Sequence, residues 1–196
     1  MKKFVSKMLA GALSLSMLCG VAAAEGETYV SWYTFGDVYL SSVRTALDAA
    51  MEAKGLKVVD KDSNANQQTQ TDDINTALVT GANAIVINLV ESGAIGTAEN
   101  LMNAVSAQNL PVVFFNRAVS TDNAEAEALF KGYDKSVFVG TDFTQAGIMQ
   151  GKMIGEYVLE HFDELDLNHD GKISYVMFKG DEANQEAIAR TKYGVE

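Results

Sequence analysis

The stretch AIVINLVESGAIGTAENLMNAVSAQNLPVVFF, residues 84–115, decides the fold class. It begins and ends with short runs of β-branched and aromatic residues, AIVINL and PVVFF, which are typical of buried strands. Between these runs, apolar residues recur at the i, i+3, i+4 and i+7 spacing of one helix face: Ala98, Leu101, Met102 and Val105. A strand, a helix and a second strand in this order predict a βαβ unit with parallel strands.

The same alternation extends in both directions from this unit. Further strand-like runs lie at 28–35, 56–60, 136–140 and 172–178. The segments between runs have apolar or small residues at helical spacing, in three sets: Val43, Leu47, Ala50 and Met51; Ile74, Ala77, Leu78 and Gly81; Gly147, Gly151, Ile154 and Val158. Residues 182–196 begin like one more helix. We therefore predict an α/β fold with a parallel sheet flanked by helices.

The N-terminus has the layout of a secretory signal peptide. A basic start, MKKFVSK, precedes an apolar run that ends in small residues, with an A-x-A-like cleavage site at Ala22 and Ala24. A membrane anchor is the alternative, but the apolar run is short and no second one follows. We expect residues 1–24 to be a signal peptide and the protein to be periplasmic or secreted. The single cysteine, Cys19, lies in this segment, so no disulfide is expected in the mature chain.

The charge of the chain restricts its partners. The sequence carries a formal net charge of −11 at pH 7, and removal of the basic leader makes it more negative. Such a surface repels phosphate backbones and anionic lipids. We therefore expect no nucleic-acid partner and no membrane-surface function.

Common catalytic and nucleotide-binding motifs are absent from the sequence. It contains no GxGxxG, no GxxxxGK[ST] and no G-x-S-x-G, and its two histidines are too few for a typical zinc site. We expect a protein that is not an enzyme. The alternative is a sugar-processing hydrolase on an α/β scaffold, for which the sequence offers only Asp37 and Glu91 as an acid/base pair.

Polar residues follow several predicted strands, where open parallel sheets bind their ligands. An aromatic ring beside a carboxylate, as at Tyr39 and Asp37, suits a sugar, because the ring covers the apolar face of the pyranose and the carboxylate accepts from hydroxyls. Asn116 directly follows the run VVFF and also fits a simple turn. The other residues in such positions are Asp62, Ser63, Asn64, Asn88, Glu91, Arg117, Lys179, Asp181 and Glu182.

The stretch DLNHDGKIS, residues 166–174, is similar to a calcium-binding EF-hand loop. Such a loop supplies oxygens from positions 1, 3, 5, 7 and 9, has a glycine at 6 and ends with a bidentate glutamate at 12. The twelfth position here is Met177, and the residues that follow the loop read as a strand, so a carboxylate from elsewhere is needed. An Asp-Gly turn is the alternative. The predicted calcium ligands are Asp166, Asn168, Asp170, Lys172 through its carbonyl, and Ser174.

The order of several segments resembles the periplasmic galactose/glucose-binding proteins of sugar ABC transport and chemotaxis. These segments are VRTALDAA, DSNANQQTQTDDI, AIVINLVESGAIGTA, LPVVFFNR, VGTDFTQAGIMQG, DLNHDGKIS, FKGD and EAIART. The resemblance implies two α/β domains of the type 1 periplasmic-binding-protein fold, which close on a sugar. Residues 25–140 correspond to the first domain, and residues 141–196 to the start of a truncated second domain with the calcium loop.

The resemblance also implies a set of sugar-binding residues. Asp37 and Asn116 match the sugar-binding aspartate and asparagine of the first domain, and Arg190 matches an arginine of the second. Tyr39 stands where a stacking phenylalanine is usual, Asn184 where a histidine is usual and Glu186 where an aspartate is usual. Ser174 replaces a longer amide among the calcium ligands. The departures at Asn184 and Glu186 predict a hydroxyl pattern that differs from that of the family.

These observations together predict an exported, monomeric sugar receptor. The resemblance implies capture of D-galactose or D-glucose, delivery to a membrane ABC permease and, in chemotaxis, to a chemoreceptor, with a structural Ca²⁺. A pentose or another hexose is the competing ligand class. A truncated reading frame that binds nothing is a further alternative.

Overall fold

The computed structural model describes residues 26–182 and 184–195. The predicted signal peptide lies outside the described residues, and no helix within them is long and apolar enough to cross a membrane. In chain order the elements are β1 (Thr28–Trp32), α2 (Val38–Glu52), β2 (Val58–Asp62), α3 (Gln67–Val79), β3 (Ala84–Ile87), α4 (Ile95–Ala107), β4 (Val112–Phe115), α5 (Asn123–Lys131), β5 (Ser136–Val139), α6 (Phe143–Glu160), α7 (Phe162–Leu165) and α8 (Gln185–Tyr193).

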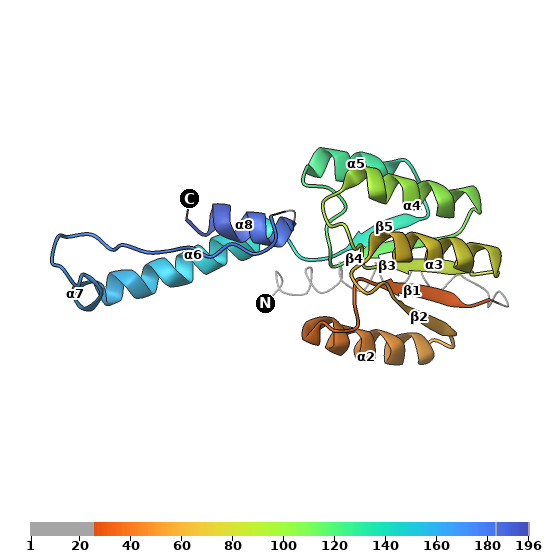
Figure 1. Cartoon of the computed structure of the whole chain (residues 1–196), viewed down its shortest axis with the longest axis horizontal. Coiled ribbons are helices and arrows are strands. Elements are labelled where there is room, and N and C mark those ends of the chain that lie inside the picture. Colours follow the sequence, from red (N-terminus) through yellow and green to blue (C-terminus); the bar gives the residue numbers. More distant parts are fainter. Residues whose placement is uncertain (1–25, 183, 196) are drawn as a thin grey trace, which may run out of the picture.

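The strands form one parallel sheet in the order β2-β1-β3-β4-β5. Helices α3, α4 and α5 cover one face, and α2 covers the other (Figure 1). Each helix connects two parallel strands, as short βαβ crossovers require. The predicted α/β class is therefore confirmed. Because all pairs of strands are parallel, the carboxyl ends of all five strands lie at one edge of the sheet.

Alternation of side chains along the strands divides the core into two layers. On the α3–α5 face the core is built on Ile85, Ile87 and Phe114, and on the α2 face it is built on Val30 and Trp32. The Trp32 ring is fully buried, meets Phe115 edge-on at a centroid distance of 5.1 Å, and donates from Nε1 to Asp60 Oδ1 at 2.6 Å.

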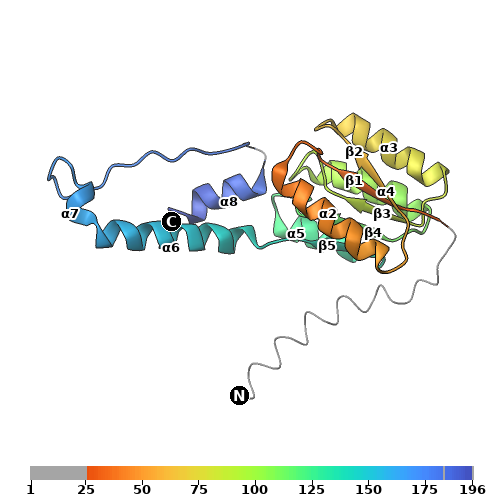
Figure 2. The ribbon, with the colours of Figure 1, turned by 90° about the horizontal axis from the view of Figure 1, so that it is seen from below.

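The chain leaves the sheet after β5 and continues into the long helix α6. Figures 1 and 2 show that α6 extends away from the sheet and that α8 lies along it. Two glycines of α6 permit this contact: a Cβ added at Gly147 would lie 2.5 Å from Ala189 O, and one at Gly151 would lie 2.6 Å from Gly194 O. The backbones of the two helices therefore approach closely. The predicted domain boundary at 140–141 falls in this passage and stays a prediction.

The predicted strand at 172–178 does not form. Residues 172–181 have no regular structure and run back along α6 from α7 (Figure 2). A strand requires a neighbouring strand for its backbone hydrogen bonds, and every strand of the described residues lies in the sheet. Tyr175, Val176 and Phe178 are accordingly exposed, Phe178 to 91%.

Candidate functional site

Asp37 lies at the N-terminus of α2 and caps this helix. Its Oδ1 accepts a hydrogen bond from Leu40 N at 2.8 Å, which satisfies one of the free N–H groups of the first turn. Within the described residues, its Oδ2 has no hydrogen-bond partner. Tyr39 lies in the first turn of α2 and is 62% exposed. The start of α2 thus presents a spare carboxylate oxygen and an open aromatic ring.

Asn116 directly follows β4 and is anchored to both neighbouring strand ends. Its backbone φ is 62°, in the left-handed region that asparagine tolerates better than most residues. Its N–H donates to Val139 O at 2.9 Å, and its Oδ1 accepts from Asn88 Nδ2 at 3.0 Å. Asn88 follows β3 and is fully buried. Asn116 therefore is a turn residue whose side chain is held in place at the edge where ligands of parallel sheets bind.

Arg117 is a charged residue of this edge that the predicted set of site residues did not include. Its Nε donates to Leu89 O at 2.7 Å and its NH2 group to Val90 O at 3.1 Å, while its Cζ lies 4.2 Å from the centroid of the Tyr33 ring. Burial lowers the pKa of Arg117, and the nearby Tyr33, Asp181 and Asp37 act in the opposite direction. The guanidinium thus connects strand-end loops and lies in the field of Asp37 and Asp181.

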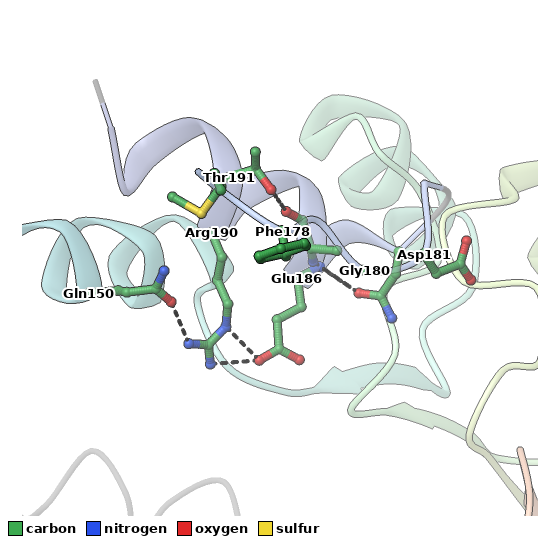
Figure 3. Close-up of a pocket in the computed structure, with 10 residues that line it drawn as sticks. Gln150, Phe178, Gly180, Asp181, Glu186, Arg190 and Thr191 are labelled. Carbon is green, nitrogen blue, oxygen red and sulfur yellow. Dashed lines mark hydrogen bonds and ion pairs between the residues drawn. The ribbon is translucent and has the colours of Figure 1, made fainter. Parts of the chain in front are cut away.

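Three predicted residues of the C-terminal part lie together around a cavity of about 380 Å³ (Figure 3). Asn184 caps α8, with its Oδ1 accepting from Glu186 N at 2.8 Å and from Ala187 N at 3.3 Å. Arg190 donates twice to Glu186 Oε1, at 2.9 Å and 2.7 Å, and once to Gln150 Oε1 of α6 at 3.1 Å. The cavity wall is therefore a fixed array of amide, carboxylate and guanidinium groups.

The predicted site residues consequently form two groups. Asp37, Tyr39 and Asn116 lie at the sheet edge, and Asn184, Glu186 and Arg190 lie around the cavity beside α8. Asp181 also lines the cavity, and its charge acts on Arg117 of the sheet edge. This electrostatic interaction links the two groups.

The predicted calcium loop folds around Asp166. This carboxylate is only 6% exposed, and its two oxygens accept from Asp170 N at 3.1 Å and from Gly171 N at 2.8 Å. Asp170 accepts in turn from Lys172 N at 2.9 Å and from Asn168 Nδ2 at 3.0 Å. The backbone φ angles of 56° at His169 and 76° at Gly171 produce the tight turn.

The ligands predicted in this loop are all oxygen atoms, which suits Ca²⁺ better than a softer metal. Ser174 is exposed and lies in the irregular segment after the loop. Among the described residues, no group of three or more His, Cys, Asp or Glu side chains is placed to hold an ion. The carboxylates of this loop therefore fit part of a calcium shell, and calcium binding stays a prediction.

Two buried residues behind the sheet edge were not predicted as important. Asn88 was noted only as a polar residue after a strand, and Gln70 of α3 was not singled out. Both are fully buried polar residues. The one signal for Asn88 was its position directly after an apolar run, and Gln70 gave none because it lies within a polar helix sequence.

Comparison with known proteins places the chain among periplasmic binding proteins. Residues 28–196 match the family described as periplasmic binding protein domain. The chain is 34% identical, over 198 aligned residues, to the D-galactose/methyl-galactoside binding periplasmic protein of Haemophilus influenzae, an alignment that covers 100% of this chain and 56% of that protein. It is 27% identical over 137 residues to the ribose import binding protein of Bacillus subtilis, covering 64% of this chain and 44% of the relative. The chain thus spans about half the length of these relatives.

Solved structures agree on the fold. A galactofuranose-binding protein superposes with a TM-score of 0.66 at 18% identity, covering 87% of this chain and 50% of that one. A solute-binding protein of Bacillus halodurans C-125 with bound myo-inositol gives a TM-score of 0.67 at 18% identity, covering 89% and 52%. The family match over most of the chain and the 34% identity over its whole length show that the chain belongs to the periplasmic binding protein domain family.

Proposed function

We propose that the protein is an exported, non-catalytic receptor that captures a hexose, D-galactose or D-glucose, for an ABC permease. The observation that carries this proposal is the similarity, along the whole chain, to a D-galactose/methyl-galactoside binding periplasmic protein. The predicted signal peptide of residues 1–24 supports the export of the protein. Delivery to a chemoreceptor and a monomeric state are parts of the same proposal.

The sugar would be held by residues from both groups of the site. Asp37 Oδ2 offers an acceptor, and the exposed Tyr39 ring offers a surface for the apolar face of a pyranose. Asn184 uses its Oδ1 as a helix cap, so its amide nitrogen is the atom that it can offer to a hydroxyl. Glu186 and Arg190 supply charge-assisted hydrogen bonds. Closure is favoured because only the closed state makes contacts from both groups.

We also propose a structural Ca²⁺ at the loop 166–174, with Asp166, Asn168, Asp170, the Lys172 carbonyl and Ser174 as its ligands. The support is the oxygen-only donor set and the buried position of Asp166. When bound, the ion would neutralise the two aspartates and hold the loop between α7 and the segment that follows it.

A pentose is the second candidate ligand class. The chain is 27% identical to a ribose import binding protein over 64% of its length, which is weaker and shorter than the galactoside match. A sugar-processing enzyme stays the less favoured alternative, since the named relatives are binding proteins.

Calorimetric titration of the natural, full-length protein with D-galactose, D-glucose, D-ribose and L-arabinose tests the proposal. We expect one of the two hexoses to bind with a micromolar or lower Kd, which corresponds to a binding free energy of about −8 kcal/mol or more negative. Binding of a pentose alone would favour the second candidate. Turnover of a glycoside by the same preparation would favour an enzyme, and the absence of binding to every sugar would refute the receptor function.

A further inference from the structure

We infer that Asn88, buried behind the sheet edge, determines which atom of the Asn116 side chain faces the ligand, and that this atom is a hydrogen-bond donor. Asn88 is then a positioning residue that sets the specificity of the site without touching the ligand. The identity of the ligand as a sugar rests on the proposed function, whereas the orientation of the two amides does not.

Two backbone groups determine the orientation of the Asn88 amide. Its Oδ1 lies 3.2 Å from Tyr33 N, and its Nδ2 lies 3.2 Å from Phe115 O. A backbone N–H can only donate and a carbonyl can only accept, so the oxygen of Asn88 must face Tyr33 and its nitrogen must face Phe115. A flipped amide would place two donors together and two acceptors together.

The orientation of Asn88 then determines that of Asn116. The second hydrogen of Asn88 Nδ2 points to the Asn116 side chain, whose facing atom at 3.0 Å must therefore be the acceptor Oδ1. The Asn116 Nδ2 has no hydrogen-bond partner among the described residues and is not one of their buried unsatisfied atoms. This amide nitrogen is free to donate to a ligand at the carboxyl edge of the sheet.

Gln70 holds Asn88 in place. Its Nε2 donates to Asn88 O at 3.1 Å and to Ser31 Oγ at 2.9 Å, and its Oε1 accepts from Val90 N at 2.9 Å. The Asn88 N–H donates to Ser31 O at 2.8 Å. Asn88 and Gln70 are fully buried, so a change in either amide would leave a buried polar group unpaired, which is costly.

Two of the three predicted side chains at the sheet edge, those of Asp37 and Asn116, consequently have opposite polarity. Asp37 offers only an acceptor, whereas Asn116 offers only a donor. A hydroxyl at Asp37 must donate its proton, and a hydroxyl at Asn116 must accept through a lone pair. This polarity, rather than the presence of an asparagine, would determine which hydroxyl pattern is recognised.

The first experiment needs no sugar. In the full-length protein labelled with ¹⁵N and ¹³C, we expect a scalar coupling across the hydrogen bond from Asn88 Nδ2 to Asn116 Cγ. The reverse coupling, from Asn116 Nδ2 to Asn88 Cγ, or no coupling between the two side chains, would overturn the inference. Failure of the protein to bind sugars leaves this result unaffected.

The second experiment uses Asn116→Asp, which keeps an acceptor for Asn88 and turns an oxygen toward the ligand. Calorimetry compares D-galactose and D-glucose with their monodeoxy and monodeoxyfluoro analogues, since fluorine accepts weakly but cannot donate. At one hydroxyl, the wild type should prefer the fluoro over the deoxy analogue by about two- to tenfold, the range of one hydrogen bond. Asn116→Asp should reverse this preference, and an unchanged preference would contradict the inference.

Asn88→Asp tests the positioning role itself. Its carboxylate can only accept, so Asn116 must turn its nitrogen inward and its oxygen toward the ligand, and the same preference should reverse. A folded Asn88→Asp protein that keeps the wild-type preference overturns the inference. A melting curve shows whether this variant folds. If it does not fold, the scalar coupling and the Asn116→Asp comparison decide whether the inference about Asn116 holds. If the wild-type protein binds no hexose, this result refutes the proposed function and not the inferred orientation of the two amides.

Discussion

A single methyl group added at Gly147 should displace the helix that carries three of the predicted sugar contacts. The Cβ of Gly147→Ala would lie 2.5 Å from Ala189 O, and contacts become ordinary only from about 3.4 Å, so α8 has to move by about 0.9 Å. Overpacking of this kind costs about 1–3 kcal/mol. Gly155 of the same helix is the matched control, because nothing lies within 4 Å of a Cβ placed there.

The two substitutions change helix propensity equally. The difference between their free energies of unfolding therefore isolates the effect of the contact with α8. Alanine in place of glycine favours a helix interior by about 1 kcal/mol. We therefore expect Gly155→Ala to raise the free energy of unfolding by up to about 1 kcal/mol and Gly147→Ala to lower it by up to about 2 kcal/mol. Urea unfolding of both variants, with equal m-values, measures this difference.

The same displacement should reach the ligand. Asn184, Glu186 and Arg190 belong to α8 or its cap, and Arg190 also bonds Gln150 of α6. Loss of one well-placed hydrogen bond weakens binding about tenfold, so Gly147→Ala should lower hexose affinity by about that factor and Gly155→Ala should not. Equal stability and equal affinity of the two variants would refute the close contact of α6 with α8.

Three further predictions concern ionisation, calcium and export. Burial and the nearby Asp60 carboxylate raise the pKa of Asp48 above its ordinary value of 3.8. Between the ordinary and the raised pKa the folded state binds more protons than the unfolded state, so the free energy of unfolding should fall as pH rises through that window. Asp48→Asn should remove this slope and stabilise the protein at pH 7 by no more than about 1 kcal/mol, as urea unfolding at several pH values would show. In the full-length protein, Ca²⁺ at 100 times its Kd should stabilise by about 2.7 kcal/mol; a melting temperature that EDTA leaves unchanged would argue against the ion, and Asp170→Asn should reduce the response. Intact mass of the exported protein should correspond to cleavage after Ala24, and retention of the basic leader would refute the signal peptide.

The fold could be predicted from sequence where structure is determined locally. The four apolar residues that defined the helix within 84–115 are all buried in α4, with at most 3% exposure, because a 3.6-residue repeat directly encodes the buried face. Helix α5 was not predicted, although Ala126, Leu129 and Phe130 give it a short apolar face at the i, i+3 and i+4 spacing that packs, only partly buried, against the core. Its Asp122 cap, which accepts from Ala124 N and Glu125 N, was a second available signal.

The error at 172–178 has a different origin. Its β-branched and aromatic residues are typical of a strand, but a strand is stabilised by its neighbours, and the sequence of one segment does not say whether a partner lies beside it. Helical segments need no such partner, and the C-terminal segment did form the predicted helix α8. Sequence thus predicts the helices, whose backbone hydrogen bonds are local, better than a strand, whose hydrogen bonds depend on a partner far away in the chain.

Sequence alone could not distinguish the structural from the proposed binding role of the site residues, because three of them combine a structural hydrogen bond with a proposed contact to the ligand. Asp37 and Asn184 each use one oxygen to cap a helix, and Asn116 uses its oxygen to accept from Asn88. The atom engaged internally leaves a defined atom for the ligand: an acceptor at Asp37 and donors at Asn116 and Asn184. On the proposed function, the cap or anchor is therefore what would give each side chain its polarity toward a sugar. It follows that Asn184, at the position where galactose/glucose-binding proteins usually have histidine, can only donate to a ligand while it caps α8, so its replacement by histidine should change ligand preference and helix stability together.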